Sequence, residues 1–225
     1  MSGGPILVVA PHPDDEVLGP GGTIARRVQE GRDVFVVVVT HADPSIFPDY
    51  SLEDGRGEAV RADGILGVRK TMFLEGFPAA LLDTVPQAAL NAAIQEVVDE
   101  LEPEVLLVPF PGDLHVDHRK VAEAALVAAR PARAHLVRQI WAYETVSETH
   151  WGWGVGPPFD ANGYVDVSAF LETKLEAAAA YESQMRAFPH ERSIEALRAL
   201  AIARGAVVGA GAAEAFQLVR AIDRW

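Results

Sequence analysis

Short runs of apolar residues alternate along the chain with stretches in which apolar and polar positions recur at helical spacing. Residues 6–10 and 34–39 are apolar at every position and are bounded by Pro, Asp or Thr. Such runs are typical of strands that are buried on both faces of a parallel sheet. Residues 86–101 instead place apolar side chains three and four positions apart, as on one face of a helix.

The same patterns predict a regular order of elements along the whole chain. Strands are expected at residues 6–10, 34–39, 71–74, 105–108, 137–143, 164–167 and 216–219. Helices are expected at residues 23–30, 58–66, 86–101, 121–129, 170–185 and 194–204, and loops at 41–55 and 151–162. Because strands and helices alternate, we expect an α/β fold with a Rossmann-like, doubly wound, mainly parallel sheet and helices on both faces.

Length and composition indicate one globular domain. The chain has 225 residues, of which 49% are hydrophobic and 23% charged. At about 150 residues per domain, this length predicts a single domain over residues 1–225. A chain of this size can bury a sufficient core without a structural metal or disulfide, so any metal is expected to serve chemistry.

Charge and cysteine content exclude several kinds of protein. The chain has no cysteine, which removes disulfide frameworks, cysteine-type zinc fingers and cysteine nucleophiles. A net charge of −13 argues against nucleic-acid binding and against adhesion to anionic membranes. No apolar run approaches the roughly 20 residues of a membrane span, and no basic segment precedes the first apolar run. We therefore expect a cytoplasmic protein that acts on neither membranes nor nucleic acids.

The candidate chemistry lies directly after the predicted strands. Residues 11–16, 40–43 and 109–118 are rich in His and Asp, and they hold four of the 7 histidines. In open α/β sheets, ligands bind at the carboxyl ends of the strands. These three segments are therefore expected to lie at one edge of the sheet and to form the functional site.

The spacing of these side chains is consistent with a hydrolytic zinc site. His12 and Asp15 are three residues apart, as are His115 and His118, so one turn can direct each pair to one point. A bound zinc ion lowers the pKa of its water to about 7, and Asp14 could accept the proton as general base. The alternative is that the Asp residues cap the next helix and that the His pair is solvated or capping.

The residues of these segments resemble the PIG-L/LmbE superfamily of zinc-dependent N-deacetylases. Residues 11–16, followed by 17–25, are similar to its first motif, and residues 112–119 are similar to its second. Further similar stretches lie at 58–68, 143–149, 164–168, 174–184 and 204–216, so the resemblance covers nearly the whole chain. It implies removal of an acetyl group from an N-acetylated sugar, most often N-acetylglucosamine in a larger conjugate.

The resemblance also implies a role for individual residues. It makes His12, Asp15 and His118 the ligands of one zinc ion per chain, with other divalent metals as substitutes. Asp14 corresponds to the general base. His115 corresponds to the residue that stabilises the oxyanion and protonates the leaving amine, and Asp117 to the residue that orients His115. Members of the family often form oligomers, so the resemblance also implies that this chain could associate with further copies of itself as a homo-oligomer.

The chain departs from the family pattern at positions that bear on the substrate. Pro20 replaces the usual small residue, and Gly55 replaces an arginine, with Arg56 next to it. Arg56 and His41, which follows the second strand, are candidate contacts of the small-molecule sugar conjugate. Trp151, in a Gly- and Pro-rich loop, could stack on a sugar ring. The alternatives are a solvated His41 and a Trp151 that packs on its own domain.

Two other functions are less consistent with the sequence than deacetylation. A Rossmann-like nucleotide-binding module would need the G-x-G-x-x-G fingerprint, but position 24 is Ile24. A metal-dependent phosphoesterase often uses two metals and more bridging carboxylates than these segments supply. Zinc-dependent deacetylation is therefore the leading hypothesis.

Overall fold

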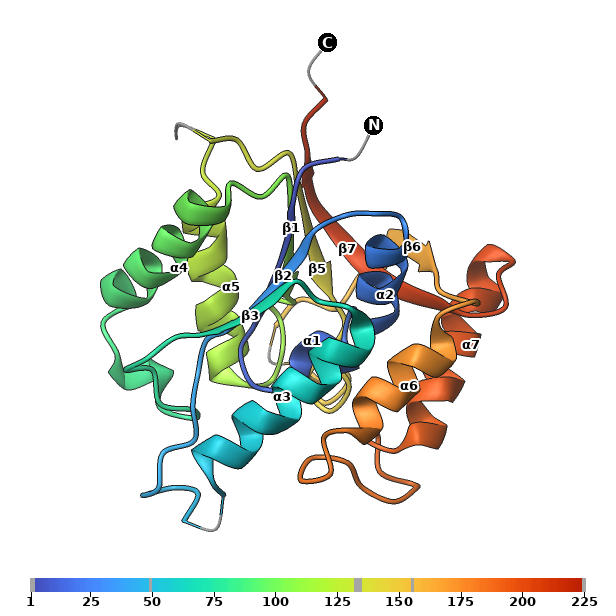
Figure 1. Ribbon diagram of the computed structural model, residues 1–225, viewed down its shortest axis with the longest axis horizontal. Helices are drawn as coiled ribbons and strands as arrows, with labels where there is room; N and C mark the ends of the chain where they lie inside the picture. Colours follow the sequence, from blue (N-terminus) through green and yellow to red (C-terminus); the bar gives the residue numbers. More distant parts are fainter. Residues whose placement is uncertain (1–2, 49, 132–134, 155, 224–225) are drawn as a thin grey trace.

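The protein forms one seven-stranded sheet with helices on both faces (Figure 1), in a computed structural model that describes residues 3–48, 50–131, 135–154 and 156–223. The strand order is β3-β2-β1-β4-β5-β7-β6. Strands β1 to β5 pair in parallel, and β7 is antiparallel to both β5 and β6. The strands are β1 (Ile6–Ala10), β2 (Val34–Val38), β3 (Lys70–Phe73), β4 (Val105–Pro109), β5 (Gln139–Tyr143), β6 (Gly163–Asp166) and β7 (Ala213–Ala221). The predicted α/β fold with a mainly parallel sheet is confirmed.

The helices form two layers, and each layer packs on its own apolar cluster. Helices α2, α3, α6 and α7 contribute to the cluster on one face, and α4 and α5 to the cluster on the other (Figure 1). The helices are α1 (Asp15–Leu18), α2 (Gly21–Gln29), α3 (Leu52–Leu66), α4 (Gln87–Leu101), α5 (Val116–Ala128), α6 (Leu171–Ala179) and α7 (Ile194–Val208), with a 3-10 helix η1 (Leu82–Thr84). Because both faces are covered, β1 is buried along its whole length, which explains its continuous apolar run.

Several boundaries differ from the sequence-based expectation. The expected loop 41–55 ends earlier, because the Ser51 side chain accepts the Asp54 N–H at 3.2 Å and α3 begins at Leu52. Helix α5 begins at Val116 and not at residue 121, since His115 caps it. Helix α6 ends at Ala179, whereas 170–185 was expected. The short elements α1 and η1 were not predicted. They have four and three residues, which is too few for a periodic pattern of apolar positions.

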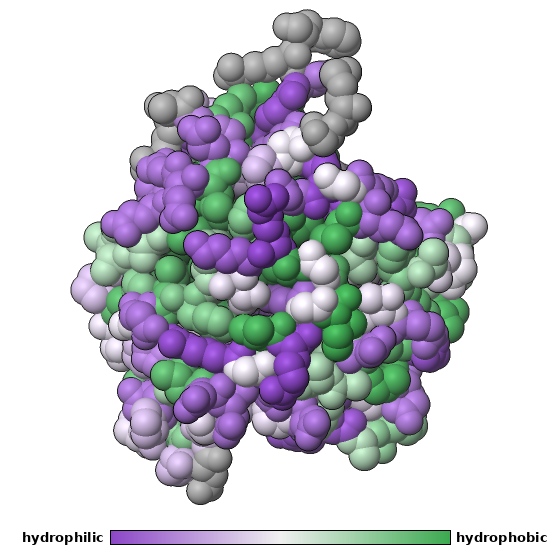
Figure 2. All heavy atoms as spheres, in the orientation of Figure 1, coloured by the Kyte–Doolittle hydropathy of each residue, from purple (hydrophilic) through white to green (hydrophobic). Residues whose placement is uncertain are grey.

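The surface of the described residues mixes polar and apolar side chains. On the face shown in Figure 2, hydrophilic side chains are spread over the molecule, with hydrophobic ones between them. No helix in the described ranges combines the length and the hydropathy needed to cross a bilayer.

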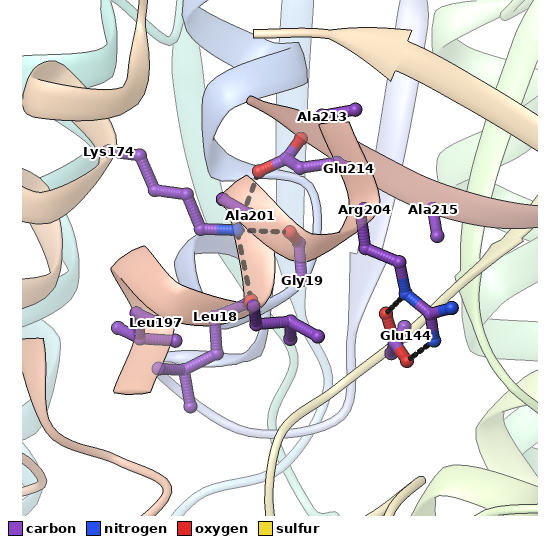
Figure 3. A pocket seen from close by; sticks show the side chains of 11 residues that line it. Leu18, Gly19, Glu144, Lys174, Leu197, Ala201, Arg204, Ala213, Glu214 and Ala215 are labelled. Carbon is purple, nitrogen blue, oxygen red and sulfur yellow. Dashed lines mark hydrogen bonds and ion pairs between the residues drawn. The ribbon is translucent and has the colours of Figure 1, made fainter. Parts of the chain in front are cut away.

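A buried ion pair fixes the segment that follows β1 against the C-terminal part of the chain (Figure 3). The Lys174 ammonium lies 2.6 Å from a Glu214 carboxylate oxygen and also donates to the carbonyls of Leu18 and Gly19. The Glu214 carboxylate accepts the N–H groups of Gly22 and Thr23, at the start of α2. The two charges thus satisfy backbone groups at the end of α1 and the beginning of α2.

Replacing Lys174 by Met is expected to lower the free energy of unfolding by about 3–5 kcal/mol. The substitution leaves the Glu214 carboxylate buried without its cation, since the two side chains are only 6% and 5% exposed. Urea denaturation followed by circular dichroism measures the change. The control is Lys70→Met, which removes a 56% exposed ammonium and should change stability by less than about 1 kcal/mol. Equal effects of the two substitutions would contradict a stabilising role for the buried pair.

Candidate metal centre and pocket

Three side chains from the segments after β1 and β4 converge at the edge of the sheet. His12, Asp15 and His118 offer one ligand atom each, and these atoms lie within 4.8 Å of one another. Asp15 is the first residue of α1, and His118 lies in the first turn of α5. The Asp15 Oδ2 atom is 3.2 Å from His12 Nδ1 and 3.2 Å from His118 Nε2. Adjacent β1 and β4 therefore bring together two motifs that lie far apart in the sequence.

The donor atoms of this cluster suit a divalent cation. Two imidazoles and a carboxylate form a typical ligand set of a catalytic zinc, which places ligand atoms about 3.4 Å apart in a tetrahedral arrangement. His118 Nε2 and Asp15 Oδ1 are buried, and neither has a hydrogen-bond partner among the described residues. Unpartnered buried polar atoms are costly, and a cation between them would satisfy them. The residues present therefore fit a metal ion.

A buried carboxylate orients the first histidine of the cluster. The Asp117 Oδ2 atom lies 3.0 Å from His12 Nε2 and accepts the N–H of Ala80 at 2.7 Å. This arrangement leaves His12 Nδ1 free for a metal, as in carboxylate–histidine–metal triads. The His115 Nδ1 atom is 3.8 Å from the same carboxylate oxygen, beyond hydrogen-bond distance. The predicted pairing of the Asp117 carboxylate with His115 is thus replaced by a pairing with His12.

A second carboxylate, which the sequence interpretation did not assign, orients the other histidine. The Asp113 Oδ2 atom lies 2.8 Å from His118 Nδ1, and Asp113 Oδ1 accepts the Thr149 hydroxyl at 2.6 Å. Both Asp113 and His118 are fully buried. The signal for Asp113 was present, because it lies in the same His- and Asp-rich segment, but its spacing of five residues from His118 does not distinguish an orienting residue from a ligand.

Asp14 lies beside the cluster in an unusual backbone conformation. Its φ of 108° lies in the left-handed region, and its side chain is buried. One carboxylate oxygen accepts a hydrogen bond from Arg192 at 2.9 Å. Burial raises the pKa of the Asp14 carboxyl to about 7, although the Arg192 guanidinium opposes the shift. A carboxyl with a pKa near neutrality can both accept and release a proton at pH 7.

The Arg192 contact had no signal in the sequence. Arg192 lies between α6 and α7, 178 positions from Asp14, and no motif surrounds it. Its Nε donates to the Ser147 hydroxyl at 3.0 Å, and Nη1 also donates to the Gln184 side chain at 3.3 Å. The guanidinium therefore joins three loops at the site.

His115 caps α5 and has a defined tautomer. Its Nδ1 accepts the backbone N–H of Asp117 at 3.1 Å, so in the neutral ring the hydrogen resides on Nε2. Burial lowers the pKa of His115 to about 4, and the neighbouring His12 adds to the shift. The low pKa favours the neutral ring, which can donate a hydrogen bond from Nε2.

An open cavity of about 380 Å³ leads to these groups. Its lining includes His12, Asp14, His115, Glu148 and Arg192. Both His41 and Arg56, predicted as substrate contacts, also line the cavity. Trp151 does not; its ring packs edge-on against His190, with 5.6 Å between the ring centres. The prediction that Trp151 stacks on the sugar is thus not supported by its position, which matches the packing alternative.

The chain is similar to known deacetylases along most of its length. The family model described as PIG-L: GlcNAc-PI de-N-acetylase matches residues 7–129. The probable N-acetyl-alpha-D-glucosaminyl L-malate deacetylase 2 of Bacillus anthracis is 30% identical over 190 residues, which cover 80% of each chain. The diacetylchitobiose deacetylase of Thermococcus kodakarensis is 29% identical over 233 residues, which cover 96% of this chain and 84% of that protein.

A solved structure extends the similarity to the whole fold. A conserved protein from Thermus thermophilus is 28% identical, has a TM-score of 0.80, and is matched over 98% of this chain and 96% of its own. The residues matched by the family model run from β1 to the end of α5, which includes the whole candidate metal cluster.

Proposed function

Because the chain belongs to the PIG-L family of GlcNAc-PI de-N-acetylases, we propose that it is a zinc-dependent hydrolase that removes the acetyl group from an N-acetylglucosamine-type sugar conjugate. The observation that carries this proposal is the cluster of His12, Asp15 and His118, of which His12 lines an open cavity together with Asp14. The relatives that support it are named as deacetylases of N-acetylated glucosaminyl malate and of diacetylchitobiose.

In this proposal His12, Asp15 and His118 hold one zinc ion. When bound, the ion polarises the acetyl carbonyl and makes a water molecule acidic enough to lose a proton at neutral pH. Asp117 and Asp113 orient the two imidazoles by accepting the N–H of one ring nitrogen, so that the other nitrogen of each ring can face the metal. His41 and Arg56 are proposed to contact the sugar conjugate from the cavity wall.

Asp14 performs the proton transfers. Its carboxylate accepts a proton from the attacking water as the carbon–oxygen bond forms, and its pKa of about 7 suits this step. When the carbon–nitrogen bond breaks, the protonated Asp14 returns that proton to the amine, which leaves as the free amino sugar; the other product is acetic acid, which loses its remaining proton to solvent and is released as acetate. Arg192 holds the carboxylate in place through its 2.9 Å hydrogen bond.

His115 stabilises the negative charge that develops on the acetyl oxygen. Its neutral ring carries a hydrogen on Nε2, because Nδ1 already accepts the Asp117 N–H. A fixed donor directed at a developing oxyanion is one of the largest contributions to amide hydrolysis. This assignment keeps the predicted oxyanion role of His115 and transfers the predicted amine protonation to Asp14.

The proposal is tested by incubating the purified protein with N-acetylglucosamine and its conjugates. Free amine and acetate should form in equal amounts, stop after treatment with a chelator, and resume on addition of zinc. Phosphate release from sugar phosphates in place of acetate would indicate the phosphoesterase. Thermal stabilisation by nucleotides, without any hydrolysis, would indicate the nucleotide-binding module.

Replacing Asp113 by Asn is expected to weaken zinc binding by about 10- to 100-fold. The amide is a poorer acceptor for the His118 N–H than the carboxylate. It also lacks the negative charge that the Asp113 carboxylate places beside the buried His118 ring. Competition with a chromophoric chelator measures the dissociation constant. The control is Asp83→Asn, at an exposed position of η1. An Asp113→Asn protein that binds zinc as tightly as the control would refute an orienting role.

A further inference from the structure

One part of the cavity lining is mainly aromatic and apolar. This wall comprises Phe47, Tyr50, Leu52, Arg56 and Phe73, which come from the segment after β2, the start of α3 and the end of β3. Phe47 and Leu52 are each 37% exposed, although both are large apolar side chains. Apolar side chains that stay exposed inside a cavity are characteristic of a ligand-binding surface.

The charge of Arg56 on this wall is compensated. The Arg56 guanidinium carbon lies 5.1 Å from the centre of the Phe73 ring, and its Nη2 donates to Glu75 at 2.5 Å. A guanidinium that is stacked on a ring and paired with a carboxylate extends the flat surface of that ring. The wall therefore presents rings and planar groups more than free charge.

This wall suits an apolar ring better than a second sugar. The side chains of Phe47, Leu52 and Phe73 can neither donate nor accept hydrogen bonds. Sugar hydroxyls that contacted these three side chains would lose water without gaining a partner, which is unfavourable, and on this wall only the Tyr50 hydroxyl and the Arg56 guanidinium offer one. An apolar ring would be transferred from water to an apolar contact and could stack on the aromatic side chains.

The cavity also restricts what the occupant can be. Its volume of about 380 Å³ is that of a small-molecule site, and Asp14 and His115 line the same cavity as the aromatic wall. A group that occupies this wall while the sugar reaches Asp14 can be part of the same substrate molecule. We propose that this wall is a subsite for an aromatic aglycone of the N-acetylated amino sugar, an inference that rests on the proposed deacetylase function.

The test compares two glycosides of N-acetylglucosamine on the zinc-loaded protein, one with a phenyl and one with a methyl aglycone. We expect kcat/KM for amine release to be at least about 10-fold higher for the phenyl glycoside, mainly through a lower KM, since the contact lies away from the reacting bond. Equal values for the two glycosides would overturn the aromatic subsite and leave the deacetylase function intact. No amine release from either would overturn both.

A pair of variants locates the preference on this wall. Phe47→Ala should bring the ratio of the two kcat/KM values close to one. The matched control is Ile46→Ala, which removes a neighbouring apolar side chain that is 40% exposed and does not line the cavity; its ratio should equal that of the unmodified protein. Because each ratio compares two substrates on one preparation, partial unfolding does not affect it. An unchanged ratio in Phe47→Ala would refute the assignment.

Discussion

Replacing Asp14 by Asn is expected to lower kcat for deacetylation by about 10²- to 10⁴-fold. The amide keeps the size of the side chain and can still accept the hydrogen bond of Arg192, but it cannot take a proton from water. Because Asp14 is not one of the three proposed ligands, zinc should remain bound at one ion per chain. The expected result is thus an inactive protein that is folded and metal-loaded.

Steady-state kinetics measure kcat, and metal analysis of the same preparation measures the number of zinc ions per chain. Asp83→Asn, an exposed position, serves again as the control and should keep both its activity and its zinc. Full activity of Asp14→Asn would show that another group takes the proton. Loss of zinc from Asp14→Asn would instead make Asp14 a ligand and leave the base unassigned.

Replacing His118 by Ala is expected to remove both the metal and the activity. The substitution deletes one of three ligands and leaves the carboxylates of Asp15 and Asp113 buried without the imidazole between them. Zinc per chain after dialysis should fall from about one to near zero, and activity should fall to that of the chelator-treated protein. His135→Ala is the control, because the His135 ring hydrogen-bonds a backbone carbonyl far from the site.

The zinc content of His118→Ala also distinguishes between two alternative sets of metal ligands. His12, His115 and Asp117 form a second group of potential ligands that shares His12 with the first. Retention of zinc in His118→Ala would contradict the assignment made above and favour the second group. His115→Ala should then lose zinc, whereas with His118 as a ligand it should keep zinc and lose only activity.

The sheet and the metal cluster could be predicted because their signals are local. A strand buried on both faces has to be apolar at each position, so β1, β2 and β4 were visible as runs in the sequence. Parallel pairing then places the ends of β1 and β4 side by side, and the motif spacing supplies the candidate ligands. No long-range information was needed for these inferences.

The remaining contacts of the site depend on packing between distant segments. Arg192 approaches Asp14 only because the loop before α7 folds back over the end of β1, and no local pattern encodes that path. The pairing of Asp117 with His12 depends on how α5 is rotated about its own axis, which the two-residue spacing between His115 and Asp117 does not reveal. The expected sugar contact of Trp151 relied on residue type alone, and its ring packs on His190.

The backbone at Asp14 has a consequence for how this protein can evolve. A non-glycine residue held at a positive φ costs about 1–3 kcal/mol, and the burial of its carboxyl adds to that cost. Glycine would adopt the same conformation without strain and would bring no buried carboxyl. Selection for thermal stability alone would therefore drive Asp14 out of the sequence, and the proposed role of Asp14 in proton transfer explains why this cost is kept.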